Sequence, residues 1–179
     1  GVTDYCQVSG SAAVGMRRVG GPKDARLVDI LDLSPDLVIA NPEENARPLV
    51  EQLDGAGIPV WLTFPKTVRE SVDDLWTLAK MFQGKTATPR LKILEDSLQL
   101  ANLAMSDTPP LRYFCPIWQG EEPDGRLWWM TFNVDTYCHD LLRICAGENV
   151  FATRQRRYPL AANWGGTIAE AGGNRDLRY

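Results

Sequence analysis

The stretch from Leu31 to Asn41 constrains the fold most, because its hydrophobic pattern changes period part-way along. Upstream, apolar residues recur at helical spacing, whereas residues 37–40 form an unbroken apolar run that is too short for a helix. Pro35 lacks a backbone N–H and disfavours helical geometry in the residue before it, so we expect the helix to end there. The stretch therefore predicts a helix, a tight turn and a buried strand of a parallel sheet.

A strand without a polar face is normally covered on both sides, so we expect helices to flank this sheet. The chain then repeats the pattern: a helix with Pro48 in its first turn precedes a strand over residues 60–64. Thr67 and Glu70 have the spacing of a capping box for the next helix. Two other polar residues are expected to cap the earlier helices: Asp24 and Asn45. This alternation predicts a right-handed parallel α/β arrangement.

A longer apolar stripe of helical period predicts a helix over residues 88–105. The pattern then changes to strands over residues 111–118 and 127–132, which form a hairpin or a long strand–loop–strand. We expect a second lobe to begin at this change of pattern.

Asp135 or Thr136 can cap the following helix, which is expected to end at Gly147, and residues 150–151 are expected to add a short strand. The apolar face of this helix is expected to carry four residues: Cys138, Leu141, Leu142 and Cys145.

Composition limits the classes of function. The chain of 179 residues is 44% hydrophobic with a net charge of -4, which suits a globular protein and gives no basic footprint for nucleic acid. Catalysis needs a nucleophile with a base, a carboxylate pair or a metal cluster, and the chain has a single histidine, His139. His139 and Cys138 could be metal ligands, but their place beside an apolar helix face favours a structural role. Cys6, at a strand end, is the better ligand candidate.

Five short segments occur in a fixed order: Gly-Val-Thr-Asp-Tyr-Cys at residues 1–6, Val-Gly-Gly at 19–21, Leu-Ser-Pro-Asp-Leu-Val-Ile-Ala at 33–40, Ala-Gly-Ile-Pro-Val at 56–60 and Cys-Ala-Gly-Glu-Asn-Val-Phe at 145–151. In order and spacing they resemble the iron-chelate and vitamin B12 (cobalamin) substrate-binding proteins of ABC importers. The resemblance implies an α/β fold of two Rossmann-like lobes with parallel sheets, joined by one long rigid helix. It also implies a first strand before residue 1 and a second lobe that is incomplete at residue 179.

By this resemblance, residues 1–87 are the first lobe, residues 88–106 the helix between lobes, and residues 107–179 the start of the second lobe. The protein would capture cobalamin or a related corrinoid or metal chelate in a cleft between the lobes and deliver it to the permease. It would be periplasmic or lipid-anchored outside the cell, would not be an enzyme and would need no cofactor. The alternative is an enzyme or metal-chelate-handling domain on the same scaffold, because fold does not fix function.

Ligand-binding residues follow in part from strand positions, because open parallel sheets present their crevice at the carboxyl ends of the strands. One wall is expected to consist of Tyr5, Cys6, Asn41 and Pro65. The other is expected to contain Trp118, Trp129 and Met130, whose large side chains can pack on a planar macrocycle. The resemblance adds Tyr179 to the second wall, with Tyr158 as the alternative.

A docking surface for the permease is the last expectation from the resemblance. A first-lobe glutamate that docks on a permease arginine falls near Arg47 in the simplest alignment. Glu43 and Glu44, slightly displaced and expected to be exposed, are therefore the candidates for permease docking.

Overall fold

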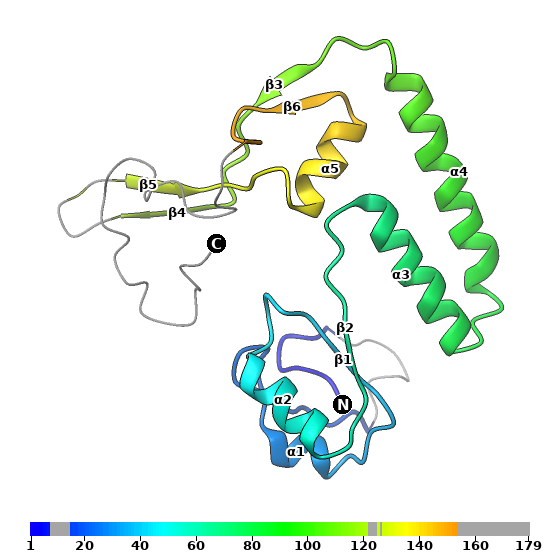
Figure 1. Cartoon of the computed structure of the whole chain (residues 1–179), viewed down its shortest axis with the longest axis vertical. Coiled ribbons are helices and arrows are strands. Elements are labelled where there is room, and N and C mark those ends of the chain that lie inside the picture. The colour runs from blue at the N-terminus through cyan, green and yellow to red at the C-terminus, as the bar shows by residue number, and fades with distance from the viewer. Residues whose placement is uncertain (8–14, 122–124, 126, 154–179) are drawn as a thin grey trace. The chain divides into compact units, whose positions relative to one another are not determined.

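The computed structural model describes residues 1–7, 15–121, 125 and 127–153 (Figure 1). The chain divides into two compact units, Gly1–Phe64 and Pro65–Tyr179. Each unit contains a pair of parallel strands and helices, so the predicted α/β class is confirmed. The first compact unit ends at Phe64, whereas the first lobe is expected to end at residue 87 and the second to begin at residue 107. The assignment of lobes stays a prediction.

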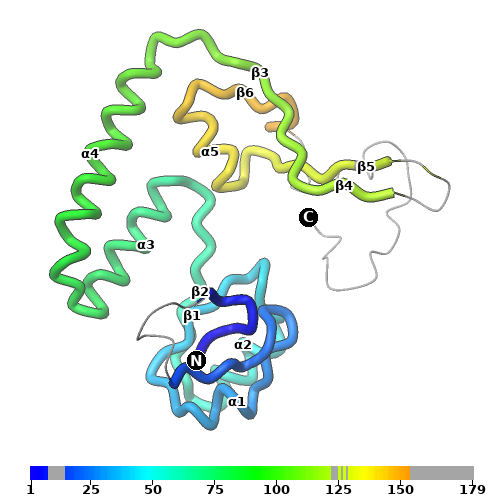
Figure 2. The backbone as a smooth tube through the Cα atoms, turned by 180° about the vertical axis from the view of Figure 1, so that it is seen from behind, coloured from blue at the N-terminus to red at the C-terminus, as the bar shows by residue number. Residues whose placement is uncertain are grey.

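In the first unit, the strands β1 (Val38–Ala40) and β2 (Val60–Leu62) pair in parallel. The helices α1 (Leu27–Leu31) and α2 (Arg47–Gly55) pack against each other (Figure 2). The order β1, α2, β2 supplies the helical crossover that a parallel pair requires. The predicted helix, turn and strand around Pro35 and the predicted parallel pairing are both confirmed.

The core of the first unit lies on one face of this strand pair. It is built on three buried residues, Val19, Ile30 and Leu53, with partly buried apolar residues packed around them: Ala25, Leu27, Leu33, Val38, Leu49, Ile58 and Val60. Ile39 lies between the inward-facing positions of β1 and is 45% exposed. Successive strand residues point to opposite faces, so the expectation that helices cover both faces is wrong for the described residues.

Two expected helix caps in the first unit are wrong. Helix α1 starts after Arg26, so Asp24 is too far from its first turn to be the N-cap residue. Helix α2 starts after Ala46, so the N-cap position is Ala46 and not Asn45. Neither helix has a side-chain cap. The Asn45 side chain instead accepts the Asn41 N–H at 2.8 Å and donates to the Pro22 carbonyl at 3.0 Å. Its amide thus joins two loops. The expected position of Pro48 in the first turn of α2 is confirmed.

The second unit contains three helices that pack on one another: α3 (Val68–Met81), α4 (Ala87–Met105) and α5 (Tyr137–Ile144). Strands β3 (Leu111–Tyr113) and β6 (Gly147–Asn149) are parallel, and β4 (Trp118–Glu121) and β5 (Leu127–Met130) form an antiparallel hairpin. The capping box of Thr67 and Glu70 is confirmed, as is the long helix that becomes α4. Within the described ranges, no helix has both the length and the apolar character needed to cross a membrane.

The strands of the second unit differ from expectation at two points. The strand predicted over residues 111–118 is interrupted between β3 and β4, where Pro116 lacks a ladder donor. The strand expected at residues 150–151 lies at residues 147–149 instead, because Ala146 has a φ of +59° and turns the chain directly after α5. A Cβ on Gly147 would lie only 2.7 Å from the Leu142 carbonyl, which explains the glycine.

The expected cap of α5 by Thr136 is confirmed, but its expected apolar face is wrong. Cys138, Leu141 and Cys145 are exposed, Leu142 is half-buried, and the buried residues are His139, Asp140 and Ile144.

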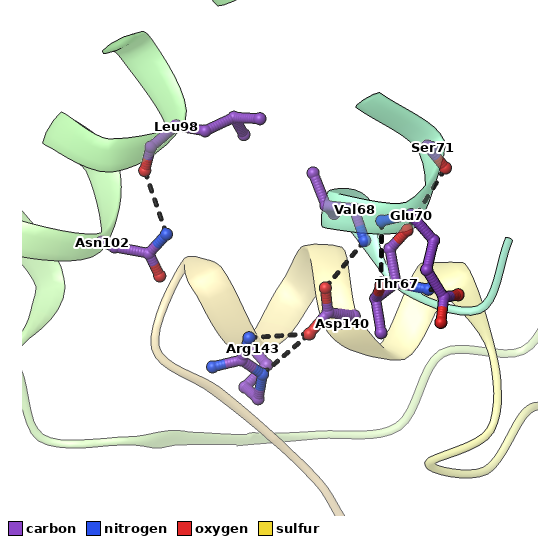
Figure 3. A network of polar contacts seen from close by, with 8 residues as sticks. All are labelled: Thr67, Val68, Glu70, Ser71, Leu98, Asn102, Asp140 and Arg143. Atoms are coloured by element: carbon purple, nitrogen blue, oxygen red, sulfur yellow. Dashed lines mark hydrogen bonds and ion pairs between the residues drawn. The ribbon is translucent and has the colours of Figure 1, made fainter. Parts of the chain in front are cut away.

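Asp140 is buried because its carboxylate has partners. Its Oδ2 accepts the Val68 N–H at 2.8 Å and its Oδ1 accepts Arg143 Nη2 at 2.7 Å (Figure 3). Burial alone would raise the pKa of Asp140, but the Val68 N–H and the Arg143 guanidinium outweigh it and lower this pKa. Asp140 therefore joins the start of α3 to α5 as a carboxylate.

We expect Asp140→Ala to lower the free energy of unfolding by about 2 kcal/mol, because it leaves the Val68 N–H and the Arg143 guanidinium without their acceptor. Urea denaturation followed by circular dichroism measures this. The matched control is Asp73→Ala, which removes a carboxylate that is 54% exposed in its ion pair with Arg69 and should cost less than about 1 kcal/mol. Equal losses in the two variants would contradict the structural role of Asp140.

A second prediction concerns His139, whose Nδ1 lies 3.5 Å from Asn149 Nδ2. Burial lowers the pKa of His139, partly offset by Asp140. The unfolded chain therefore binds more protons below about pH 6.5, so the stability from neutral His139 is complete above that pH and is lost below it. We expect the parent to lose more stability than His139→Asn between about pH 7 and about pH 5 in urea denaturation. Parallel pH profiles would contradict this.

Candidate ligand-binding site

Asn41 holds together the loops that follow β1 and β2. Its Nδ2 donates to the Thr63 carbonyl at 3.1 Å, and its Oδ1 accepts the Glu43 N–H at 2.8 Å. The Thr63 N–H in turn donates to the Ala40 carbonyl at 2.9 Å. Asn41 thus lies at the carboxyl ends of the strands, as expected, but its half-buried amide is engaged with the backbone. Its geometry suits a framework role better than direct contact with a ligand.

Tyr5 projects from a loop that is joined to this region. Its side chain is 79% exposed, and a Cβ on Gly21 would lie 3.2 Å from Tyr5 Cε2, so the ring rests on the Gly21 backbone. The neighbouring Asp4 N–H donates to the Gly20 carbonyl at 2.9 Å. Since Asn45 bonds the Pro22 carbonyl, the loops at residues 3–6, 20–22 and 41–45 form one surface, here called the strand-end edge. This edge brings together Tyr5, Cys6 and Asn41.

Cys6 is exposed at the same edge. Thr3 Oγ1 lies 3.2 Å from its sulfur, and hydrogen bonds from Thr3, with the charge of Arg18, lower the pKa of the Cys6 thiol. Arg18 was not among the site residues predicted from the sequence. Its guanidinium bonds backbone carbonyls of residues that are 12 to 15 positions away, and no local motif signals such contacts.

The aromatic candidates of the second unit lie on two faces of the β4–β5 hairpin. Trp118 pairs directly with Met130, and Gln119 pairs with Trp129. Cross-strand partners share a face and adjacent residues alternate, so Trp118 and Met130 lie on one face and Trp129 on the other. Trp118 is 54% exposed, and Trp129 and Met130 are half-buried. The hairpin therefore supplies Trp118 with Met130, or Trp129, to one surface, but not all three.

Two other ligand-binding candidates are Pro65 and Tyr179. Pro65 is half-buried and is the first residue of the second unit. Tyr179 and its alternative Tyr158 lie outside the described residues. All three stay expectations.

The two acidic candidates for permease docking differ in exposure. Glu44 is exposed, whereas Glu43 is half-buried and its backbone carbonyl accepts a hydrogen bond from Lys23 Nζ. The expectation that both acids are exposed is therefore wrong for Glu43. Glu44 is the residue of the pair that a partner protein could reach first.

The metal candidates do not come together in the described part of the chain. No group of three or more histidine, cysteine, aspartate or glutamate residues there could hold a metal ion. His139 is buried beside Asn149, whose Nδ2 donates to the Phe132 carbonyl at 2.9 Å. This geometry favours the structural role of His139.

A hollow of about 410 Å³ lies between α3, α4 and α5 in the second unit. It is lined by the buried Val68, Val72 and Ile144 and by two ion pairs, Arg69–Glu95 at 3.1 Å and Lys92–Asp96 at 2.9 Å. A third ion pair of the lining, Arg143–Asp140 at 2.7 Å, is drawn in Figure 3. The charges around the hollow compensate one another, so no charged ligand is favoured.

Comparison with known proteins gives a consistent picture. No protein-family model matches the chain. The vitamin B12-binding protein of Vibrio parahaemolyticus is 24% identical over 159 residues, which are 88% of this chain and 54% of that protein. The solved periplasmic vitamin B12-binding protein BtuF of Vibrio cholerae matches with a TM-score of 0.68 at 23% identity, over 83% of this chain and 56% of that one. A periplasmic haem-binding protein from Pseudomonas aeruginosa matches with a TM-score of 0.58 at 20% identity, over 82% and 53%.

The chain spans about half the length of the curated relatives that it matches. Over that span the fold is similar to that of the solved structures, and the similarity in sequence extends across more than four-fifths of the chain. In sequence the chain is therefore similar to vitamin B12-binding proteins, and in fold it is similar to solved periplasmic vitamin B12-binding and haem-binding proteins.

Proposed function

We propose that this chain is part of the solute-binding component of an ABC importer, and that it captures cobalamin, another corrinoid or a related metal chelate such as haem. The observation that carries the proposal is the strand-end edge, where the exposed ring of Tyr5 rests on Gly21. Its relatives are named vitamin B12-binding and haem-binding proteins, and these names supply the class of ligand. By the same relatives we propose a periplasmic or lipid-anchored extracellular location.

The edge suits a flat ligand for physical reasons. A ring that is 79% exposed can bury one face against a macrocycle, and apolar burial with aromatic packing favours such contact. Asn41 and Asn45 join the neighbouring loops through their side-chain amides. Because these loops are already held in place, they lose little conformational entropy when a ligand binds. Cys6 follows Tyr5 in the same loop and is exposed, so it can contact the ligand or its metal.

The competing function is an enzyme or metal-chelate-handling domain on the same scaffold. The two differ in what happens to the ligand: a binding protein returns the chelate unchanged after incubation, whereas an enzyme converts it. The relatives are binding proteins by name, and this favours capture without chemistry.

We expect Tyr5→Ala to weaken binding of cyanocobalamin or haem to the native protein roughly 5- to 150-fold, because about 1–3 kcal/mol of stacking and apolar contact is lost. Titration followed by absorbance and tryptophan fluorescence measures the affinity. Tyr137→Ala is the matched control, since Tyr137 is a surface tyrosine of α5 that is 38% exposed. Unchanged affinity in Tyr5→Ala, or equal losses in both variants, would reject the strand-end edge as the site.

For the permease we propose docking through Glu44, with a smaller contribution from the half-buried Glu43. Glu44→Lys should weaken association with the transporter at low salt, where surface charges are least screened. Glu51→Lys is the control, because Glu51 is a surface acid of α2 whose side chain is 60% exposed. Binding of both variants to transporter in nanodiscs as tightly as the parent would exclude Glu44 from docking.

A further inference from the structure

One arginine bonds the main chain on both sides of Tyr5. Arg18 Nη1 donates to the carbonyls of Thr3 at 2.7 Å and Asp4 at 2.6 Å, and Arg18 Nη2 donates to the carbonyl of Cys6 at 3.1 Å. Carbonyls in a loop have no strand or helix partner of their own, and a rigid guanidinium fork can serve several at once. The backbone that carries Tyr5 is therefore held from one side by a single side chain.

The adjacent Arg17 has a different set of partners. Its Nη2 pairs with the carboxylates of Asp29 at 3.1 Å and Asp32 at 3.2 Å. Arg18 has no carboxylate partner among the described residues, so its charge is not neutralised by an ion pair. Its contacts are with backbone carbonyls, and its charge acts on the nearby Cys6 thiol.

The contact between Tyr5 and Gly21 does not fix the loop by itself. Gly21 lies against the ring, and Asp4 bonds Gly20, but neither contact reaches the backbone beyond Tyr5. A backbone bond from the Cys6 N–H to the Thr3 carbonyl at 3.1 Å closes the turn around Tyr5, and the Arg18 fork bonds Asp4 and Cys6, the two residues that flank Tyr5. Arg18 and this turn together set the direction in which the Tyr5 side chain leaves the loop.

We propose that Arg18 is the positioning residue of the strand-end edge, which holds residues 3–6 so that Tyr5 and Cys6 are presented together. That these two residues face a ligand rests on the proposed function above, whereas the arrangement of the loop does not. An edge that is ordered in advance loses less conformational entropy when a ligand binds. Arg18 thus contributes to affinity without touching the ligand.

The test compares Arg18→Gln, Arg18→Lys and the control Arg17→Gln in the native protein. Arg17→Gln removes the same charge one residue away but leaves the carbonyl contacts in place. The first readout needs no ligand: it is the pH profile of Cys6 alkylation by iodoacetamide, followed on the Cys6 peptide by mass spectrometry. Arg18→Gln should move its midpoint to higher pH, because the loop that holds Thr3 against the Cys6 sulfur is loosened and the nearby cation is lost, and Arg17→Gln should leave it unchanged.

The second readout is the affinity for cyanocobalamin and haem, with thermal melting as the check on folding. Arg18→Gln should weaken binding about tenfold or more, since bonds to a charged donor are lost from the loop. Arg18→Lys keeps the charge but not the fork, so it should loosen the Thr3 contacts that lower the pKa of Cys6, move the alkylation midpoint to higher pH as well, and still bind weakly. The melting temperature of both Arg18 variants should stay within the range of the parent and Arg17→Gln.

The outcomes separate this proposal from the proposed function. If the parent binds neither ligand, the proposed function fails, and the alkylation profile still decides whether Arg18 orders the loop. If Arg18→Gln matches Arg17→Gln in alkylation and affinity, Arg18 positions nothing. If Arg18→Lys restores the full affinity, the weaker binding of Arg18→Gln is due to the lost charge. If affinity falls only together with the melting temperature, the weaker binding is due to impaired folding. Either result would overturn the positioning role.

Discussion

Both units depend on polar side chains that satisfy backbone groups where short strands and helices end. The paired strands are three or four residues long, so most of the surrounding loop backbone has no ladder partner. In the first unit Asn41 bonds the Thr63 carbonyl, and in the second unit Asp140 accepts the Val68 N–H. An unpaired buried backbone group costs about 1–3 kcal/mol, more than the net contribution of a typical hydrogen bond, so the loops can take these paths only with the side chains in place.

This dependence explains which parts of the fold the sequence predicts. Features that depend only on residues a few positions apart were predicted correctly. These are the capping box of Thr67 and Glu70, and the position of Pro48 in the first turn of α2. Asn45 also has the residue type of a cap, but its amide bonds Asn41 and Pro22 instead. Local propensity cannot foresee a competing partner that lies more than 20 positions away, as Pro22 does from Asn45.

The same limit applies to α5 and to the candidate site. Hydrophobic spacing assigned the buried face of α5 to Leu141, whereas Asp140 is buried because α3 supplies a donor. Tyr5 is exposed, as predicted, but it lies in a turn after an isolated bridge at Val2 and not at the end of a strand. The separation of Trp118 from Trp129 required the register of the hairpin, which a one-residue shift would reverse. Arg18 is invisible to sequence patterns because its partners are carbonyls, which every residue has.

A single exposed ring cannot supply the affinity that capture of a solute needs. Stacking on one aromatic side chain contributes about 1–3 kcal/mol, whereas association costs roughly 4–15 kcal/mol in lost translational and rotational freedom. An ordered strand-end edge lowers the additional cost of fixing the loop, but it does not offset the whole. Most of the binding free energy must therefore come from contacts beyond Tyr5 and its neighbours. It follows that the edge presents a fixed flat surface, while the choice among corrinoid, haem and other chelates is decided largely by those further contacts.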